Sequence, residues 1–288
     1  MERALIYALI FLAGFAAVSI IAFAIIIRPP GIEISGTPST YHLPAEDVTI
    51  VTADGLKLAA WFIPREDGRR DAPAILLLHG YPAEKSDMLP LASRLYKHFP
   101  ILLLDLRSFG DSEGAYTTLG VRERDDVKRA VRFLKEEGAP AVGVFGFSLG
   151  GAVGLTTAAE DSRVRAVAAY APFSDLRTLG YESYARLWLL KYPLVELMLF
   201  WADLLFGGSA REPSPISAAG TLSIPVFLAA SREDEQIPFS HAERLRAALA
   251  KNPAAEFYFF DQGRHGELPS DFESRLIRFF SAALESPN

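Results

Sequence analysis

A serine between two glycines constrains the fold of this chain more than any other feature. The pentapeptide Gly-Phe-Ser-Leu-Gly at 146–150 directly follows the apolar run 141–145, and helix-forming residues follow it. In the order strand, Gly-x-Ser-x-Gly, helix, the serine stands at a tight, strained turn, and side chains in place of Gly146 and Gly150 would crowd it. The pattern predicts a nucleophile at Ser148. The alternative is an ordinary strand-to-helix turn.

Apolar runs and amphipathic stretches alternate along the chain beyond residue 47. Short, fully apolar runs predict buried strands, and apolar residues at helical spacing predict helices. Such repeated units favour an α/β fold, a doubly wound, mostly parallel sheet of about eight strands with helices on both faces. Strands are expected at 48–52, 57–63, 74–78, 101–104, 141–145, 164–170, 225–230 and 256–260, and helices at 86–99, 121–137, 149–159, 240–250 and 271–284.

The N-terminus contains an apolar segment long enough to cross a bilayer. Residues 4–27 carry no charged side chain, and at ~1.5 Å per residue they span about 36 Å, against ~30 Å for a bilayer core. The segment predicts a single-pass transmembrane anchor over residues 1–28. The alternative is a cleaved signal peptide, with a small-residue cleavage site at 22–24.

The anchor is followed by a linker and one globular domain. Residues 29–47 are rich in Pro, Gly, Ser and Thr and predict the linker, and the domain is expected over 48–288. The flanking charges, Arg3 against Glu2 before the apolar segment and Arg28 after it, leave the orientation open. By the positive-inside rule, these charges favour an extracytoplasmic domain.

Charge and cysteine content exclude several kinds of function. The net charge of −6 argues against a nucleic-acid partner, because phosphate binding needs a concentrated basic surface. The chain has no cysteine, so disulfides, thiolate metal sites and a cysteine nucleophile are excluded.

A long insertion interrupts the alternation of strands and helices. Residues 176–223 lie between two expected strands, and their centre, 184–201, is rich in aromatic residues and leucine. Three interpretations stay open: helices packed on the sheet edge, a short helical lid forming an apolar acyl pocket over the serine, or a surface resting on the membrane.

A base for Ser148 must come from a loop at the carboxyl edge of the sheet. His265 fits, because it follows the last expected strand in a glycine-flanked loop. His42 lies in the linker, His98 ends a helix, and His241 opens a helix, where a surface or capping role is expected. His265 is therefore the predicted base.

An acid that orients the imidazole should follow the strand at 225–230. Three carboxylates stand there, Glu233, Asp234 and Glu235, and any of them could instead be surface charge.

Backbone N–H groups are expected to form an oxyanion hole. One belongs to Leu149, directly after the serine, and the other to Tyr81, in the loop after the strand 74–78. Gly80 lets that loop approach closely, and His79 is expected to support the loop by hydrogen bonds rather than to catalyse.

From about residue 48 onward the chain resembles the α/β-hydrolase superfamily. The resemblance rests on His79-Gly80, on 105–114, on 146–151 and on the Asp234 and His265 pair, in the superfamily's order serine, aspartate, histidine. Asp234 matches the aspartate of the family's acid block, so the resemblance selects it as the acid. Departures from the family patterns occur at Ser108, Ser231 and Ile237. The N-terminal segment and the insertion resemble, more loosely, the Bem46-like group.

The resemblance implies acyl transfer without metal or cofactor. His265 would take the proton of Ser148, and the serine would attack the carbonyl of a small-molecule ester or acyl substrate. Two alternatives stay open. One is a serine peptidase or amidase that binds a peptide amine through Glu233, Glu235 or Glu267, and the other is a non-catalytic, membrane-tethered scaffold. The oligomeric state does not follow from the sequence.

Overall fold

A computed structural model describes residues 1–31 and 36–285 of the chain. The predicted linker falls partly on residues 32–35, and the predicted domain end on 286–288, which lie outside the described residues. Within the linker, a 3-10 turn occupies Pro38–Tyr41, and the first strand begins at Glu46.

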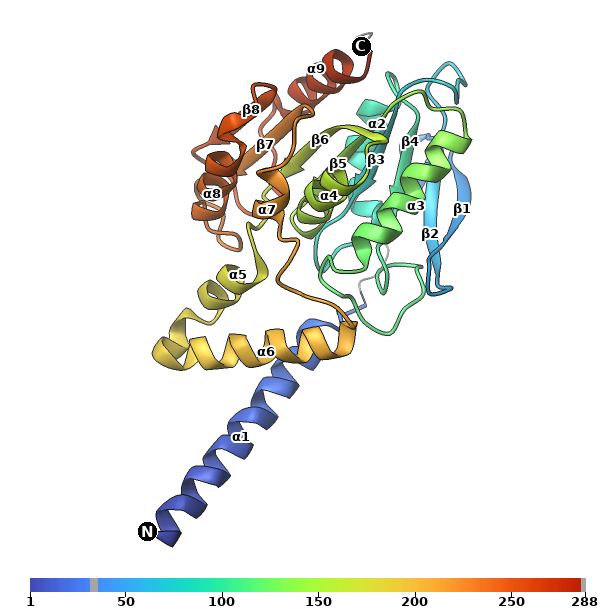
Figure 1. The fold of residues 1–288 in the computed structure, drawn as a ribbon. Coiled ribbons are helices and arrows are strands. Elements are labelled where there is room, and N and C mark those ends of the chain that lie inside the picture. The colour runs from blue at the N-terminus through green and yellow to red at the C-terminus, as the bar shows by residue number, and fades with distance from the viewer. Residues whose placement is uncertain (32–35, 286–288) are drawn as a thin grey trace.

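A single eight-stranded sheet organises the domain (Figure 1), with the strand order β1-β2-β4-β3-β5-β6-β7-β8. β2 pairs antiparallel with both β1 and β4, and all later neighbours pair in parallel. This confirms the predicted mostly parallel sheet, and the antiparallel pairs lie at its β1 edge. The strands are β1 (Glu46–Val51), β2 (Lys57–Ile63), β3 (Ala74–Leu78), β4 (Ile101–Leu104), β5 (Val142–Phe147), β6 (Val164–Tyr170), β7 (Val226–Ser231) and β8 (Ala255–Phe260).

Helices cover both faces of the sheet because the apolar strands point side chains alternately to either side. In β3, Leu76 and Leu78 join the core layer beneath α3 and α4, and Ile75 and Leu77 join the layer beneath α2 and α9. The covering helices are α2 (Leu89–Leu95), α3 (Glu123–Glu136), α4 (Leu149–Glu160), α7 (Pro215–Ala219), α8 (Ser240–Ala248) and α9 (Phe272–Glu285).

The expected helix at 86–99 is shorter than predicted. A 3-10 turn at Lys85–Met88 comes first, and α2 begins only at Leu89. The reason is Pro90, which has no N–H to donate inside a helix and is tolerated only in the first turn.

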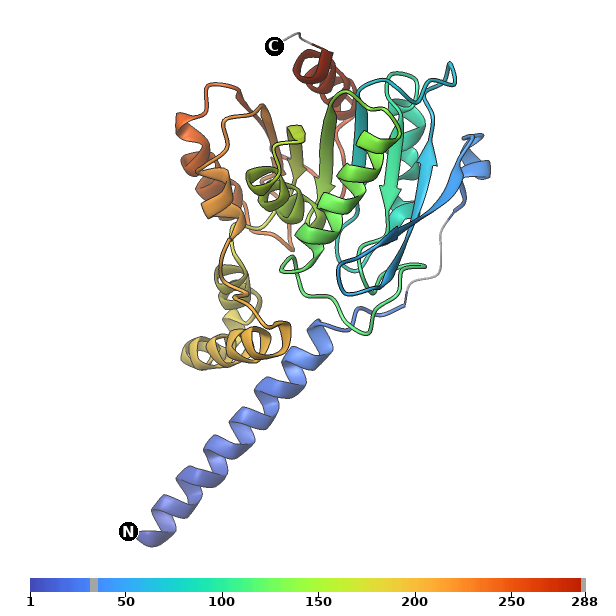
Figure 2. The same ribbon diagram turned by 45° about the vertical axis from the view of Figure 1, so that its right-hand side comes forward.

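The remaining helices lie outside the two layers. The insertion forms α5 (Leu176–Ser183), a 3-10 segment (Ala185–Leu190) and α6 (Lys191–Phe206), and the N-terminus forms α1 (Glu2–Ile26). α6 crosses the end of α1 nearest the domain (Figures 1 and 2) and packs on it rather than on a sheet edge. Among the described residues, α1 is the one helix long and apolar enough to cross a membrane.

Candidate active site

Ser148 stands at a strained turn between β5 and α4. Its backbone has φ 51° and ψ −114°, a region that non-glycine residues rarely occupy. A Cβ on Gly150 would lie 2.5 Å from the carbonyl oxygen of His79, and one on Gly146 would overlap the backbone of Gly150. The two glycines therefore let the strand, the loop after β3 and the helix meet closely enough to hold this serine.

His265 and Asp234 form a buried pair. The His265 Nδ1 lies 2.7 Å from the Asp234 Oδ2, and the two side chains are only 5% and 1% exposed. The other carboxylate oxygen of Asp234 accepts hydrogen bonds from the backbone N–H groups of Gln236 (2.9 Å) and Ile237 (2.8 Å). The structure thus brings Asp234, of the three carboxylates in its loop, to the imidazole and fixes its orientation.

The loop of His265 is held against the end of β5, the strand before Ser148. The imidazole packs on Phe147, the residue before Ser148, with ring centroids 4.7 Å apart and the ring planes tilted by 38°. Glu235 accepts a hydrogen bond from the His265 backbone N–H (3.1 Å). Within residues 1–31 and 36–285, no hydrogen bond joins the Ser148 hydroxyl to His265, and such contacts often tighten only when substrate binds.

Tyr170 is a supporting residue that the sequence interpretation missed. Its hydroxyl donates to the Glu267 carbonyl oxygen at 2.7 Å, and its ring stacks on Phe147. Burial, aided by the negative charge of Asp234, raises the pKa of Tyr170 far above its usual value, so the hydroxyl stays a neutral donor. The sequence signal that could have identified Tyr170 is its place at the carboxyl end of β6, the strand beside β5.

The two predicted oxyanion-hole residues lie beside Ser148. Leu149 is the first residue of α4, so its N–H has no partner within the helix. Tyr81 follows Gly80, where an added Cβ would come within 3.1 Å of the Ser148 Cβ. Tyr81, Ser148 and Leu149 all border the same cavity.

His79 supports this loop from below. It is fully buried, accepts a hydrogen bond from the Leu106 N–H at Nε2 (3.0 Å), and contacts the Gly80 carbonyl oxygen through Nδ1 (2.8 Å). The acceptor role of Nε2 makes Nδ1 the donor. Burial lowers the pKa of His79, so the ring is neutral.

His241 is not at the surface, contrary to expectation. It is fully buried, and its Nδ1 accepts a hydrogen bond from the Ser174 N–H at 3.0 Å. Its Nε2 lies 2.8 Å from a carboxylate oxygen of Glu182 in α5. Helix α8 carries an inward-facing histidine because the insertion folds back over it, and His241 ties the insertion to the core.

An apolar cavity of about 490 Å³ opens above Ser148. Besides the serine and Tyr81, its walls come from α5 and α6 of the insertion and from the end of α1. The size lies within the range of small-molecule sites, ~300–1,000 Å³. In the part of the chain that the structure describes, no group of three or more His, Asp or Glu side chains could hold a metal ion.

Comparison with known proteins places the chain in a family. The sequence profile described as "Alpha/beta hydrolase family" matches residues 75–278. The chain belongs to this family. It is 28% identical over 257 residues to the uncharacterized protein YfhR of Escherichia coli K12, covering 85% of this chain and 83% of YfhR.

Two further similarities connect this hydrolase to named proteins. It is 27% identical over 249 residues to the alpha/beta hydrolase domain-containing protein WAV2 of Arabidopsis thaliana, covering 80% of this chain and 75% of WAV2. The solved structure of the Pyrococcus furiosus esterase Pf2001 superposes with a TM-score of 0.71 at 25% identity, covering 89% of this chain and 99% of the esterase.

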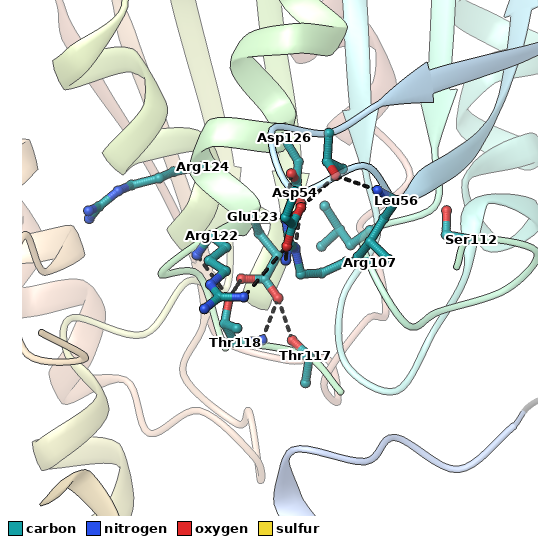
Figure 3. Close-up of polar contacts among 12 residues, drawn as sticks. Asp54, Leu56, Arg107, Ser112, Thr117, Thr118, Arg122, Glu123, Arg124 and Asp126 are labelled. Carbon is teal, nitrogen blue, oxygen red and sulfur yellow. Dashed lines mark hydrogen bonds and ion pairs between the residues drawn. The ribbon is translucent and has the colours of Figure 1, made fainter. Parts of the chain in front are cut away.

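A buried polar cluster beside the site anchors the loop between β4 and α3 of this hydrolase (Figure 3). Arg107 donates from Nε to Asp126 at 2.6 Å and from Nη1 to Asp54 at 2.9 Å. The bond from Arg107, together with one from the Thr52 hydroxyl, holds the pKa of Asp54 well below its usual range. The Glu123 carboxylate, also buried, accepts from the Thr117 hydroxyl at 2.6 Å. The 105–114 block therefore ties the loop to the β1–β2 turn and to α3.

Replacing Arg107 by methionine should lower the free energy of unfolding by about 3–5 kcal/mol, because it strands a buried carboxylate on Asp126. Arg132→Met removes an exposed ion pair with Glu136 on α3 and should change the free energy of unfolding by less than ~0.5 kcal/mol. Thermal unfolding of the full chain in detergent measures both. Equal melting temperatures for the two variants would show that the Arg107 pair does not hold the loop.

Proposed function

We propose that this chain is a membrane-anchored serine hydrolase that cleaves carboxylic esters through an acyl-enzyme on Ser148. The observation that carries the proposal is the buried His265–Asp234 pair, which packs on Phe147 next to a strained serine that borders an apolar cavity. The similarity to an esterase of known structure supports the ester as the substrate class.

The proposed reaction has two balanced steps. The Ser148 oxygen bonds to the ester carbonyl carbon as His265 takes the serine proton, and the C–O bond to the alcohol then breaks, with His265 returning that proton to the alcohol. Water attacks the acyl-enzyme in the same way and releases the acid. Asp234 keeps the His265 Nδ1 protonated, which leaves Nε2 free to accept.

The oxyanion formed in each step would lie between the backbone N–H groups of Leu149 and Tyr81. Donors fixed before the reaction stabilise developing charge without reorganisation, and each is worth about 2.7–4 kcal/mol. The lack of side chains at Gly80 and Gly150 supports this role. A Cβ at either position would clash where the loop after β3 meets the turn that holds Ser148.

The proposal also covers the place of the protein in the membrane and its subgroup within the family. We propose α1 as a single-pass anchor, with the domain on the extracytoplasmic side, and a place in the Bem46-like group. Packing of α1 on α6 supports an uncleaved segment, because Phe23 and Ile27 are buried in that contact. Most other α1 side chains are exposed and apolar, as a lipid-facing helix requires.

The site favours an ester substrate over a short peptide that is bound through its amino group. Of the carboxylates proposed to hold such an amine, Glu235 borders the cavity. Its two oxygens already accept from the His265 backbone N–H and from Arg264. Glu267 accepts from the Arg264 backbone N–H at 2.9 Å. Both carboxylates therefore hold the histidine loop.

Labelling of the full chain by a fluorophosphonate probe tests the proposal. The wild-type protein in detergent should be labelled, because the probe bonds to an activated serine, and Ser148→Ala should not be. Ser162→Ala, which changes an exposed serine, should be labelled like the wild type. A folded wild-type protein that stays unlabelled, or labelling that survives Ser148→Ala, contradicts the proposal.

A further inference from the structure

The anchor helix contributes to the cavity that contains Ser148. Phe23 and Ile26, one turn apart on α1, line that cavity together with Val195, Met198 and Leu199 of α6. An anchor that only tethered the domain would leave its side chains outside the site. Here two side chains of α1 face the space above Ser148.

Contacts at three places fix α1 on the domain. The Phe23 ring packs on Phe206 with centroids 5.9 Å apart. The Trp201 indole N–H donates to the Ser19 hydroxyl at 2.9 Å. The Thr117 backbone N–H donates to the carbonyl oxygen of Ile27 at 2.8 Å. The last contact comes from the loop that the polar cluster of Figure 3 anchors, so the end of α1 is tied to the core.

The cluster formed with α6 involves only the C-terminal half of the anchor, from Phe15 to Ile27. Over these residues the chain rises ~18 Å, at ~1.5 Å per residue. Arg28 follows, and its guanidinium donates to the Ala24 carbonyl oxygen at 3.2 Å. If α1 spans the bilayer, α6 lies at the depth of the leaflet next to the domain, where helix faces buried ~5–10 Å into the headgroup boundary are stable.

The insertion exposes apolar side chains at that depth. Trp188 is 75% exposed, Leu204 69% and Phe200 51%. Phe200 and Leu204 belong to α6, the helix that crosses the end of α1 (Figures 1 and 2), and Trp188 lies in the segment just before it. A soluble protein rarely leaves such a patch in water. The leaflet that surrounds α1 is the occupant that fits it.

Resting on the proposed function, we propose that the substrates are membrane lipids with a long acyl chain. The chain enters the cavity from the leaflet in which α6 lies, and its ester reaches Ser148. Phe23 and Ile26 limit the chain length that the cavity accepts. The anchor helix thereby acts as a wall of the acyl-binding pocket.

A pair of adjacent isoleucines tests the role of α1 in chain-length selection. Ile26 lines the cavity, whereas Ile25, ~100° further round the helix, is 66% exposed. With the full chain in phosphatidylcholine vesicles, Ile26→Trp should lower the ratio of kcat/KM for p-nitrophenyl palmitate over butyrate by about tenfold or more, and Ile25→Trp by less than about twofold. Ile26→Phe should shift the ratio in the same direction by less.

The outcomes separate this inference from the proposed function. Fluorophosphonate labelling and butyrate hydrolysis report that each variant is folded and active. If both persist in the Ile26 variants and the ratio stays at the wild-type value, α1 does not shape the pocket, and the inference fails while the hydrolase stands. If the wild type shows neither labelling nor hydrolysis, the proposed function itself fails.

Quenching by brominated phosphatidylcholine tests the immersion of the insertion without any substrate. Tryptophan fluorescence of the full chain in such vesicles should be quenched, and Trp188→Phe should remove a large share of that quenching. Trp61→Phe should remove none, because Trp61 lies in the sheet, where its indole bonds to Asp47. Equal quenching in the wild type and Trp188→Phe would show that the apolar surface faces water and would overturn leaflet entry.

Discussion

Replacement of His265 by alanine should lower kcat about 10⁶-fold, as removal of either the serine or the histidine of such a unit does. Of the bases among the described residues, the imidazole is in position, because it packs on Phe147 beside Ser148 and is oriented by Asp234. Without it, the serine oxygen must lose its proton to water. KM should change little, because His265 is absent from the lining of the apolar cavity.

Steady-state hydrolysis of p-nitrophenyl butyrate by the full chain in detergent measures this loss. His98→Ala is the matched control, since His98 is exposed in the turn that follows α2, and it should keep wild-type activity. The double variant Ser148→Ala/His265→Ala should be no slower than Ser148→Ala alone, because the two residues act as one unit. A loss below about tenfold in folded His265→Ala would exclude it as the base.

The sheet was predictable because its signals are local and agree with one another. Runs such as Ala74–Leu78 are apolar at every position, as burial on both faces requires. Helix ends were less predictable where one residue decides them, as Pro90 does for α2. The strained turn at Ser148 was predictable from Gly146 and Gly150. A Cβ at either position would overlap neighbouring backbone atoms.

The cavity walls could not be read from the sequence. Ile25 and Ile26 are chemically identical, and only the packing of α6 against α1 puts one in the cavity and the other outside it. The same holds for His241, whose position at the start of a helix indicated a surface or capping role, whereas Glu182 of the insertion covers it in the structure. Tertiary contacts between segments far apart in the chain decide such positions.

Replacement of Asp234 by asparagine should lower kcat about 10⁴-fold and leave the fold intact. The asparagine oxygen can still accept from the backbone N–H groups of Gln236 and Ile237. Its NH₂ group then faces the His265 Nδ1 as a donor, so Nδ1 must accept and Nε2 carries the proton. That tautomer cannot take the proton of Ser148.

Glu235→Gln provides the matched control, because Glu235 also contacts His265, but only through the backbone N–H. A glutamine oxygen accepts the same bond, so kcat should fall by less than about tenfold. The kcat of both variants with p-nitrophenyl butyrate, measured alongside their melting temperatures, decides between the two acids. If Glu235→Gln loses as much activity as Asp234→Asn at unchanged stability, the assignment of Asp234 as the orienting acid is wrong. A loss confined to Asp234→Asn means instead that catalysis depends on the tautomer that this carboxylate imposes on the imidazole.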